Sequence, residues 1–201
     1  WLARGLARAA EGRIVTDALV WRIEEGKSSL AVDVEIGPKT VRYETQKLIW
    51  AAPAFLLPHV WKQMPTALKT AARAGDYAPW LTANLHLSDF PEERRGAPPA
   101  WDNVLYDSAG LGYVVATHQL IRRRLTGTVF TYYRALSDVA PAAGRRLLLE
   151  TPRESWADGI LSELSAIHPD IRRLTTRLDV FRNGHAMRRP VPGSLFHGER
   201  E

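Results

Sequence analysis

Histidine is the residue type in this chain best suited to acid–base or metal chemistry. The six histidines are scattered without the short spacing of metal ligands, at positions 59, 86, 118, 168, 185 and 197. The chain also lacks a Gly-x-Ser-x-Gly elbow, a His-Glu-x-x-His pair and a phosphate loop. The adjacent carboxylates Glu24-Glu25 and Glu92-Glu93 lie in polar stretches typical of a surface. The sequence therefore predicts no metal site and identifies no catalytic residue.

A second group of side chains that could do chemistry falls in the stretch from Tyr77 to Leu87, where two kinds of side chain alternate. A period of two is typical of a β-strand with one buried face. The apolar set predicts the core face. The opposite face could meet a ligand, and it carries Trp80, Thr82, Asn84 and His86.

Three further β-branched and aromatic runs follow, at 103–106, 111–118 and 128–133. Together with 77–87 they predict a largely antiparallel sheet. His118 closes the second run, and two interpretations stay open for it. It could act as an acid, a base or a substrate-binding group, or it could be a structural residue at the end of a strand.

The segment from Glu11 to Pro53 precedes this sheet and has the most regular pattern in the chain. Apolar and charged residues alternate through successive short stretches, which are broken at Gly26 and at Gly37-Pro38. This pattern predicts a β-meander with one solvent-exposed face. A short amphipathic helix is predicted before it, within residues 1–10.

Helical patterns follow each group of strands, at 54–61, 65–74, 142–149 and from Thr151 to Ile167. Thr151, Pro152 and Glu154 form a capping-box arrangement at the start of the last helix. Its apolar stripe is expected to pack on the back of the sheet, and a strand is predicted at 174–181. The predicted fold class is α+β, a mainly antiparallel sheet flanked by helices with an N-terminal β-meander.

Composition limits the classes of partner. The chain has 201 residues, 45% of them hydrophobic, no cysteine and a net charge of +5. It has no apolar run long enough to span a bilayer. The arginine clusters 122–124, 145–146, 172–173 and 188–189 could form a phosphate-binding stripe, but a solvated basic surface is the simpler interpretation. No nucleic-acid partner and no membrane span are predicted.

Three motifs of the meander, in this order and spacing, carry a family resemblance: Gly12-Arg13-Ile14, Val20-Trp21-Arg22-Ile23 and Ala51-Ala52-Pro53. The segment resembles the meander of flavin-dependent amine oxidases and related FAD oxidoreductases. The resemblance implies that the adenine end of FAD meets this segment, with Val20, Ala51, Ala52 and Pro53 as cofactor-binding residues. At Val20 only the main chain is implied, because the side chain is expected in the core.

The run from Trp101 to Gln119 strengthens this resemblance and is similar to a bacterial subgroup of amine-oxidase-like proteins. Some members of that subgroup are exported by the twin-arginine route, so either the cytoplasm or export of the folded protein to the periplasm is compatible. The resemblance implies a small-molecule substrate pocket over the flavin. Its expected lining is Trp80, Thr82, Tyr113, His118 and Tyr132.

The chain departs from the amine-oxidase pattern in two respects. The family strand that matches 77–87 carries a lysine that holds a water against the flavin, but this chain has no lysine after Lys69, and Thr82 stands near that position. The turn at 184–193, which precedes the last FAD-binding segment in the resembling subgroup, has Ala186 and Met187 where an aromatic cage would lie. His185 could face the flavin or be a structural turn residue.

The glycine motif that receives the FAD pyrophosphate, Gly-x-Gly-x-x-Gly after a strand, is absent. We therefore expect a fragment of a longer enzyme that would neither hold FAD nor act alone. Residues 1–53 would belong to the FAD-binding region, 54–185 to a substrate-binding domain, and 186–201 to a segment returning to the FAD-binding core. The alternative is a non-catalytic module that binds a protein or polymer through the aromatic strand face.

Overall fold

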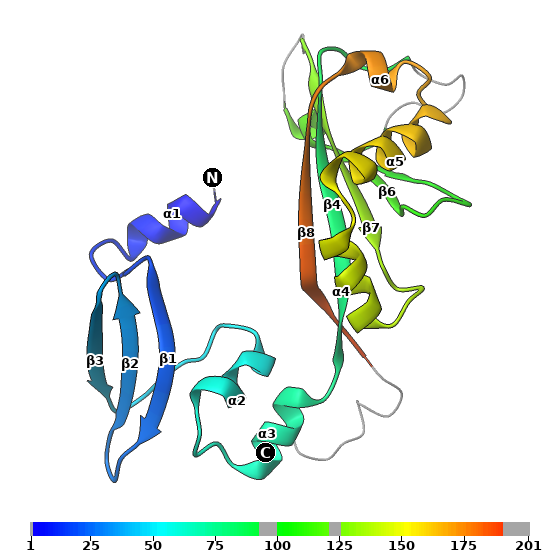
Figure 1. Cartoon of the computed structure of the whole chain (residues 1–201). Coiled ribbons are helices and arrows are strands. Elements are labelled where there is room, and N and C mark those ends of the chain that lie inside the picture. Colours follow the sequence, from blue (N-terminus) through cyan, green and yellow to red (C-terminus); the bar gives the residue numbers. More distant parts are fainter. Residues whose placement is uncertain (1, 93–99, 121–125, 191–201) are drawn as a thin grey trace. The chain divides into compact units, whose positions relative to one another are not determined.

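The structure is a computed structural model that describes residues 2–92, 100–120 and 126–190 (Figure 1). The chain divides between Ala74 and Gly75 into two compact units, which are described separately. The arginine cluster 122–124 and the part of the return segment beyond Pro190 lie outside the described residues. Within those residues, no helix has the length and apolar character needed to cross a membrane.

The first unit contains the predicted β-meander, which is confirmed. After α1 (Leu2–Ala9), the strands β1 (Ala18–Glu25), β2 (Leu30–Ile36) and β3 (Lys39–Thr45) pair antiparallel in sequence order. The turn after β1 closes with a hydrogen bond from the Gly26 amide to the Ser29 carbonyl at 2.8 Å. Gly37 adopts a φ of 57° in the turn after β2, a conformation that glycine reaches without steric cost.

Short helices complete this unit: η1 (Ala54–Leu56), α2 (Leu57–Val60) and α3 (Thr66–Arg73). Leu57, Val60 and Trp61 pack against the small core of the meander, which is built from Ile23, Val32 and Val34. Residues 54–74, which the sequence analysis placed with the substrate-binding part, therefore pack in one unit with the meander.

The charged face of the meander is held by a ladder of ion pairs across its three strands. Arg42 on β3 donates two hydrogen bonds, of 2.7 and 2.8 Å, to the Asp33 carboxylate on β2. Arg22 on β1 approaches the same carboxylate at 3.8 Å. The hydrogen bond from Arg42 holds the pKa of Asp33 below its usual value, despite the opposing effect of burial. The cross-strand pairs thus fix the register of the meander.

The second unit is a five-stranded antiparallel sheet in the order β5-β6-β7-β4-β8. Its central strand is β4 (Asp76–Leu87). The other strands are β5 (Asp102–Val104), β6 (Gly112–Val115), β7 (Thr128–Ala135) and β8 (Thr175–Arg189). The helical turn η2 (Ala116–Gln119) follows β6. The alternation predicted for 77–87 is observed, because Leu81, Ala83 and Leu85 are completely buried.

The helices α4 (Pro141–Glu150), α5 (Arg153–Ser165) and α6 (Ile171–Leu174) cover this buried face (Figure 1). Trp156, Ile160 and Leu164 of α5 enter the core, as the apolar stripe predicted. The predicted capping box was wrong. Thr151 ends α4 instead, and α5 starts after Pro152 without a side-chain cap. The α+β class is confirmed.

Candidate functional site

The face of the sheet opposite the helices is the candidate site. On β4, Trp80, Thr82, Asn84 and His86 all point to this face and are half-buried. Cross-strand neighbours on a sheet share a face, so β7 adds Tyr133 beside Thr82 and Thr131 beside Asn84. The Trp80 and Tyr133 rings lie nearly parallel, with 6.4 Å between their centroids. The result is an aromatic pair on a face that carries both polar and apolar side chains, Phe181 on β8 among them.

Hydrogen bonds fix the polar side chains of this open face. The Tyr133 hydroxyl donates to an Asp102 carboxylate oxygen at 2.6 Å, and the Thr131 hydroxyl donates to the Asn84 side-chain oxygen at 2.9 Å. The bond to Asp102, together with burial, raises the pKa of Tyr133 to about 12. Tyr133 is therefore a neutral donor at physiological pH, and its ring is held in place for stacking.

A cluster of three ionisable side chains, His86, Asp179 and Arg177, lies on the same face near the C-terminal end of β4. A carboxylate oxygen of Asp179 on β8 lies 3.3 Å from the His86 ring nitrogen Nε2. Arg177 donates to the other oxygen of Asp179 at 2.9 Å. The hydrogen bond from Arg177 keeps the pKa of the Asp179 carboxyl below its usual value. The face thus carries an ionised carboxylate between two basic side chains.

The five residues predicted to line a substrate pocket do not share one surface. Trp80 and Thr82 lie on the open face. Tyr113 and Tyr132 point to the opposite face, where both are buried in the core under the helices. His118 lies in η2, where its side chain is exposed.

The two buried tyrosines instead connect the sheet to the helices. The Tyr132 hydroxyl donates to Glu163 of α5 at 2.8 Å, and burial and this bond raise the pKa of Tyr132 strongly. The Tyr113 hydroxyl lies 2.7 Å from Nε2 of the buried His168. Burial raises the pKa of Tyr113 to about 12 and lowers that of His168. Both tyrosines are therefore core residues, each with a hydrogen-bond partner on the helical side of the sheet.

The cofactor-binding candidates belong to the meander unit. Val20 stands at an irregularity of β1, because it pairs with Val34 whereas Arg22 pairs with Asp33, so Trp21 is an extra residue. Such a β-bulge leaves main-chain groups without a strand partner and often lies beside a functional site. Ala51, Ala52 and Pro53 are exposed and small, so a ligand could approach their main chain closely.

The second half of β8 carries the residues expected near a flavin. His185 approaches the Tyr77 ring edge-on, with 6.1 Å between centroids, and burial lowers its pKa. Ala186 and Met187 are exposed on the same strand. Across 2–92, 100–120 and 126–190, no group of His, Asp and Glu is arranged to hold a metal ion.

Sequence reasoning missed the contribution of Tyr133, Thr131 and Asp102 to the open face. Their roles depend on which residue stands opposite which across three strands. The alternation within 128–133 was visible, but it does not give the register between strands.

No family model and no curated protein matches the chain. Solved structures do match its fold. A putrescine oxidase variant with redesigned cofactor binding superimposes with a TM-score of 0.67 at 12% identity, over 89% of this chain and 37% of its own. A cyclohexylamine oxidase from Brevibacterium oxydans gives 0.57 at 10% identity, over 82% of this chain and 33% of its own.

A third solved structure, of a protein assigned as a protoporphyrinogen oxidase from Exiguobacterium, gives a TM-score of 0.62 at 9% identity, over 88% of this chain and 36% of its own. The chain therefore spans about a third of the length of these oxidases. At such low identity the likeness is one of fold. The fold is that of a segment of amine and protoporphyrinogen oxidases.

Proposed function

We propose that this chain is the substrate-facing part of an FAD-dependent oxidoreductase of the amine-oxidase type, within a longer polypeptide. The observation that carries the proposal is the open face of the sheet, with its aromatic pair and fixed polar groups, in a fold shared with oxidases. In the complete protein this face would bind a small molecule and hold it against the flavin. A substrate carbon would transfer a hydride to the flavin.

The open face is suited to binding and orienting a substrate. The stacked rings of Trp80 and Tyr133 offer an extended apolar surface. Thr82 lies beside it on β4, paired with Tyr133 on β7 and with Phe181 on β8. Because Asp102 holds the Tyr133 hydroxyl, that ring does not have to be ordered when a ligand binds. Pre-organised side chains of this kind place a substrate at a lower entropic cost.

The meander unit fits contact with the nucleotide end of FAD. Main-chain N–H and C=O groups at the Val20 bulge could bind adenine without a special side chain. The small residues Ala51 and Ala52 allow close approach. When bound, the flavin supplies the hydride acceptor. The residues of this chain would bind the nucleotide end of FAD and orient the substrate.

Thr82 stands where the matching strand of amine oxidases is expected to carry a lysine, and this difference limits the type of reaction. Thr82 does lie on the open face, at the register position beside Tyr133 and Phe181. A threonine hydroxyl can orient a water or a substrate group but carries no positive charge. We therefore propose an oxidase-like reaction in which no lysine of this sheet takes part.

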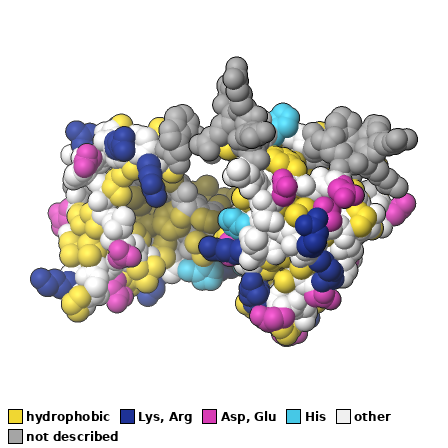
Figure 2. Space-filling model, turned by 90° about the horizontal axis from the view of Figure 1, so that it is seen from above, with side chains coloured by type: hydrophobic (Ala, Val, Ile, Leu, Met, Phe, Trp, Pro, Cys, Tyr) yellow, Lys and Arg dark blue, Asp and Glu magenta, His cyan; other side chains and the backbone are white. Residues whose placement is uncertain are grey.

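Exposed apolar side chains support burial of the meander unit in a larger protein. Figure 2 shows hydrophobic side chains over much of one face of this unit, with charged side chains scattered around them. Its large exposed apolar side chains include Leu19, Trp21, Tyr43, Leu48 and Ile49, and Ile49 is 90% exposed. Exposed groups of this kind mark interaction surfaces. The FAD-binding core of the same polypeptide is the proposed partner.

The test is to express the complete gene product that contains these residues and to compare a substitution on the open face of β4 with one away from this sheet. Trp80→Ala should weaken substrate binding, seen as a raised KM or a smaller change in the flavin spectrum on adding substrate. His59→Ala, an exposed change in the other unit, should leave both unchanged. Equal behaviour of the two variants would refute a role for the open face.

The alternative is a non-catalytic module in which the same open face binds a protein or polymer. The aromatic pair is compatible with this function as well. A complete gene product without a Gly-x-Gly-x-x-Gly segment before these residues would favour the module and contradict the oxidoreductase.

A further inference from the structure

The strand β8 forms one outer edge of the five-stranded sheet, next to β4. In the described part of the chain no strand pairs with its outer side. An unpaired edge presents a row of N–H and C=O groups that can accept another strand. On β8, every second residue presents its main-chain N–H and C=O groups to this open edge.

The register of the sheet identifies these residues, because consecutive residues of a strand direct their main-chain groups to opposite edges. The amide of Leu111, next to β6, donates to the Tyr133 carbonyl at 3.0 Å, so the main chain of Tyr133 faces β6. The main chain of the preceding Tyr132 then faces β4, where its partner is Ala83.

Thr82 is the neighbour of Ala83 on β4, so its main chain faces β8, where its partner is Phe181. The main-chain groups of Val180 and Arg182, on either side of Phe181, therefore point away from the sheet. Two N–H and two C=O groups of β8 are thus directed outward at this point.

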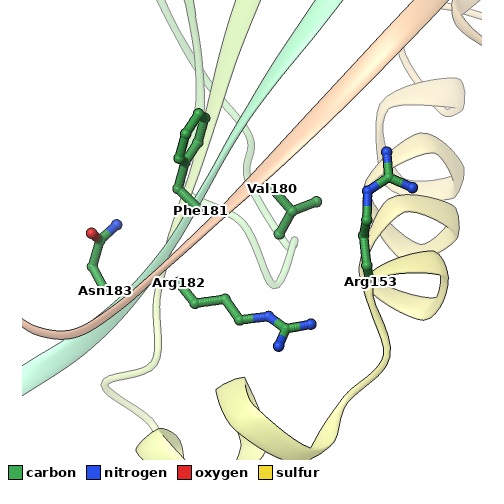
Figure 3. A pocket seen from close by; sticks show the side chains of 5 residues that line it. All are labelled: Arg153, Val180, Phe181, Arg182 and Asn183. Atoms are coloured by element: carbon green, nitrogen blue, oxygen red, sulfur yellow. The ribbon is translucent and has the colours of Figure 1, made fainter.

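A pocket of about 480 Å³ lies at this same stretch, lined by Arg153, Val180, Phe181, Arg182 and Asn183. In Figure 3, Val180 and Arg182 point toward α5, whereas Phe181 and Asn183 point to the opposite side of the strand. The pocket therefore follows the strand edge and reaches both faces of it. Its sides offer an apolar surface, from Val180 and Phe181, beside two guanidinium groups.

The arginines of the pocket already bind main-chain carbonyls. Arg153 donates to the carbonyl of Leu178, and Arg182 donates to that of Thr151 at 3.0 Å. Each guanidinium has five N–H donors. Among the described residues, the carboxylate that pairs with one of these arginines is that of Glu154, at 3.6 Å from Arg153. Donors therefore remain for a ligand, and the hydrogen-bond acceptors that hold each arginine in place are main-chain carbonyls.

We propose that an extended peptide segment carrying a carboxylate side chain binds here, as an additional strand along Val180–Asn183 of β8. Its main chain would pair with the outward groups of Val180 and Arg182, and its carboxylate would bind Arg153 and Arg182. A second copy of this chain would bring an equally basic edge, so charge favours an acidic partner.

The experiment selects from a displayed library of random ten-residue peptides on the immobilised 201-residue chain. The selected peptides should combine Asp or Glu with β-branched residues. A synthetic copy of the leading peptide should bind the double variant Arg153→Gln, Arg182→Gln at least about tenfold more weakly. Arg146→Gln, an exposed change on α4, should bind it as the unchanged chain does.

N-methylation of the peptide tests the strand pairing without altering the protein. Methyl groups on alternate residues should abolish binding in one phase of the alternation and spare it in the other, since a strand presents its N–H groups to one edge at every second residue. Several outcomes would overturn the proposal: failure to enrich acidic peptides, equal binding by the double variant, no dependence on the phase of methylation, or dimerisation of the chain through this edge.

Discussion

Glu163 accepts hydrogen bonds from three groups that lie far from it in sequence. Its carboxylate receives the Ser108 hydroxyl, the Gly110 amide at 2.6 Å and the Tyr132 hydroxyl at 2.8 Å. Tyr132 and Gly110 are buried, so their donors have no access to water as a replacement. One residue of α5 thus ties the loop between β5 and β6 to the centre of the sheet.

Replacing Glu163 by alanine should lower the free energy of unfolding by about 3 kcal/mol, because buried donors lose their acceptor. Chemical denaturation measures the loss. Glu154→Ala, which removes an exposed carboxylate of the same helix, should change stability by no more than about 0.5 kcal/mol. Equal effects of the two changes would show that the three bonds to Glu163 contribute nothing.

The buried His168 predicts a pH dependence of stability. Burial lowers its pKa in the folded chain, so the unfolded chain binds the proton more tightly. Its contribution is fully present above the unfolded pKa of about 6.5 and is lost as the pH falls below that value. As the pH falls below about 6.5, the free energy of unfolding should decrease by up to about 1.4 kcal/mol per pH unit, until the pKa of His168 in the folded chain is reached.

Denaturation curves at several pH values between 5 and 7, run on the unchanged chain and on His168→Gln, would measure this contribution. The variant should lose the extra slope in this interval. The lowered pKa values of Asp33 and Asp179 act only at more acidic pH, below about 4. A slope that is the same in both proteins would assign the pH dependence to other groups.

At the scale of elements, the pairing of β5 with β6 depends on Gly112. Gly112 has a φ of 145°, and a Cβ added there would collide with the Asn103 carbonyl on β5. Gly112→Ala should therefore cost at least about 2 kcal/mol of folding stability. Gly159→Ala in α5, where a Cβ meets open space, should instead stabilise the chain by about 1 kcal/mol. Thermal melting of both variants tests the contrast, and a stable Gly112→Ala protein would contradict it.

Periodicity within one element was sufficient to predict the meander, the two faces of β4 and the buried stripe of α5. These depend on residues close in sequence, such as the alternation from Trp80 to Leu87. Cross-strand relations were not accessible in the same way. The stacking of Trp80 on Tyr133 requires the register of β4 against β7, and one residue of slip would move Tyr133 to the other face.

The placement of Tyr113 and Tyr132 shows the same limit. Aromatic residues with a hydroxyl suit both a ligand face and a core that offers a hydrogen-bond partner. The partners that draw these two into the core, His168 and Glu163, lie more than 30 residues away in sequence. The predicted capping box does not form because Thr151 is the C-terminal cap of α4, and Pro152 directly precedes α5.

At the scale of the whole molecule, each unit has one face that its own residues cover and one that they leave accessible. Among the described residues, the helices of the second unit cover one side of its sheet. The first unit has a small core and several exposed apolar side chains. In the proposed oxidoreductase, the FAD-binding core of the same polypeptide would bury part of these accessible faces.

The most direct test of this account is the visible absorbance of the purified complete gene product, before and after incubation with FAD and removal of unbound nucleotide. The account predicts the absorbance bands of a bound flavin, at about one FAD per chain. A protein that is colourless when purified, and stays colourless after incubation with FAD, would contradict it.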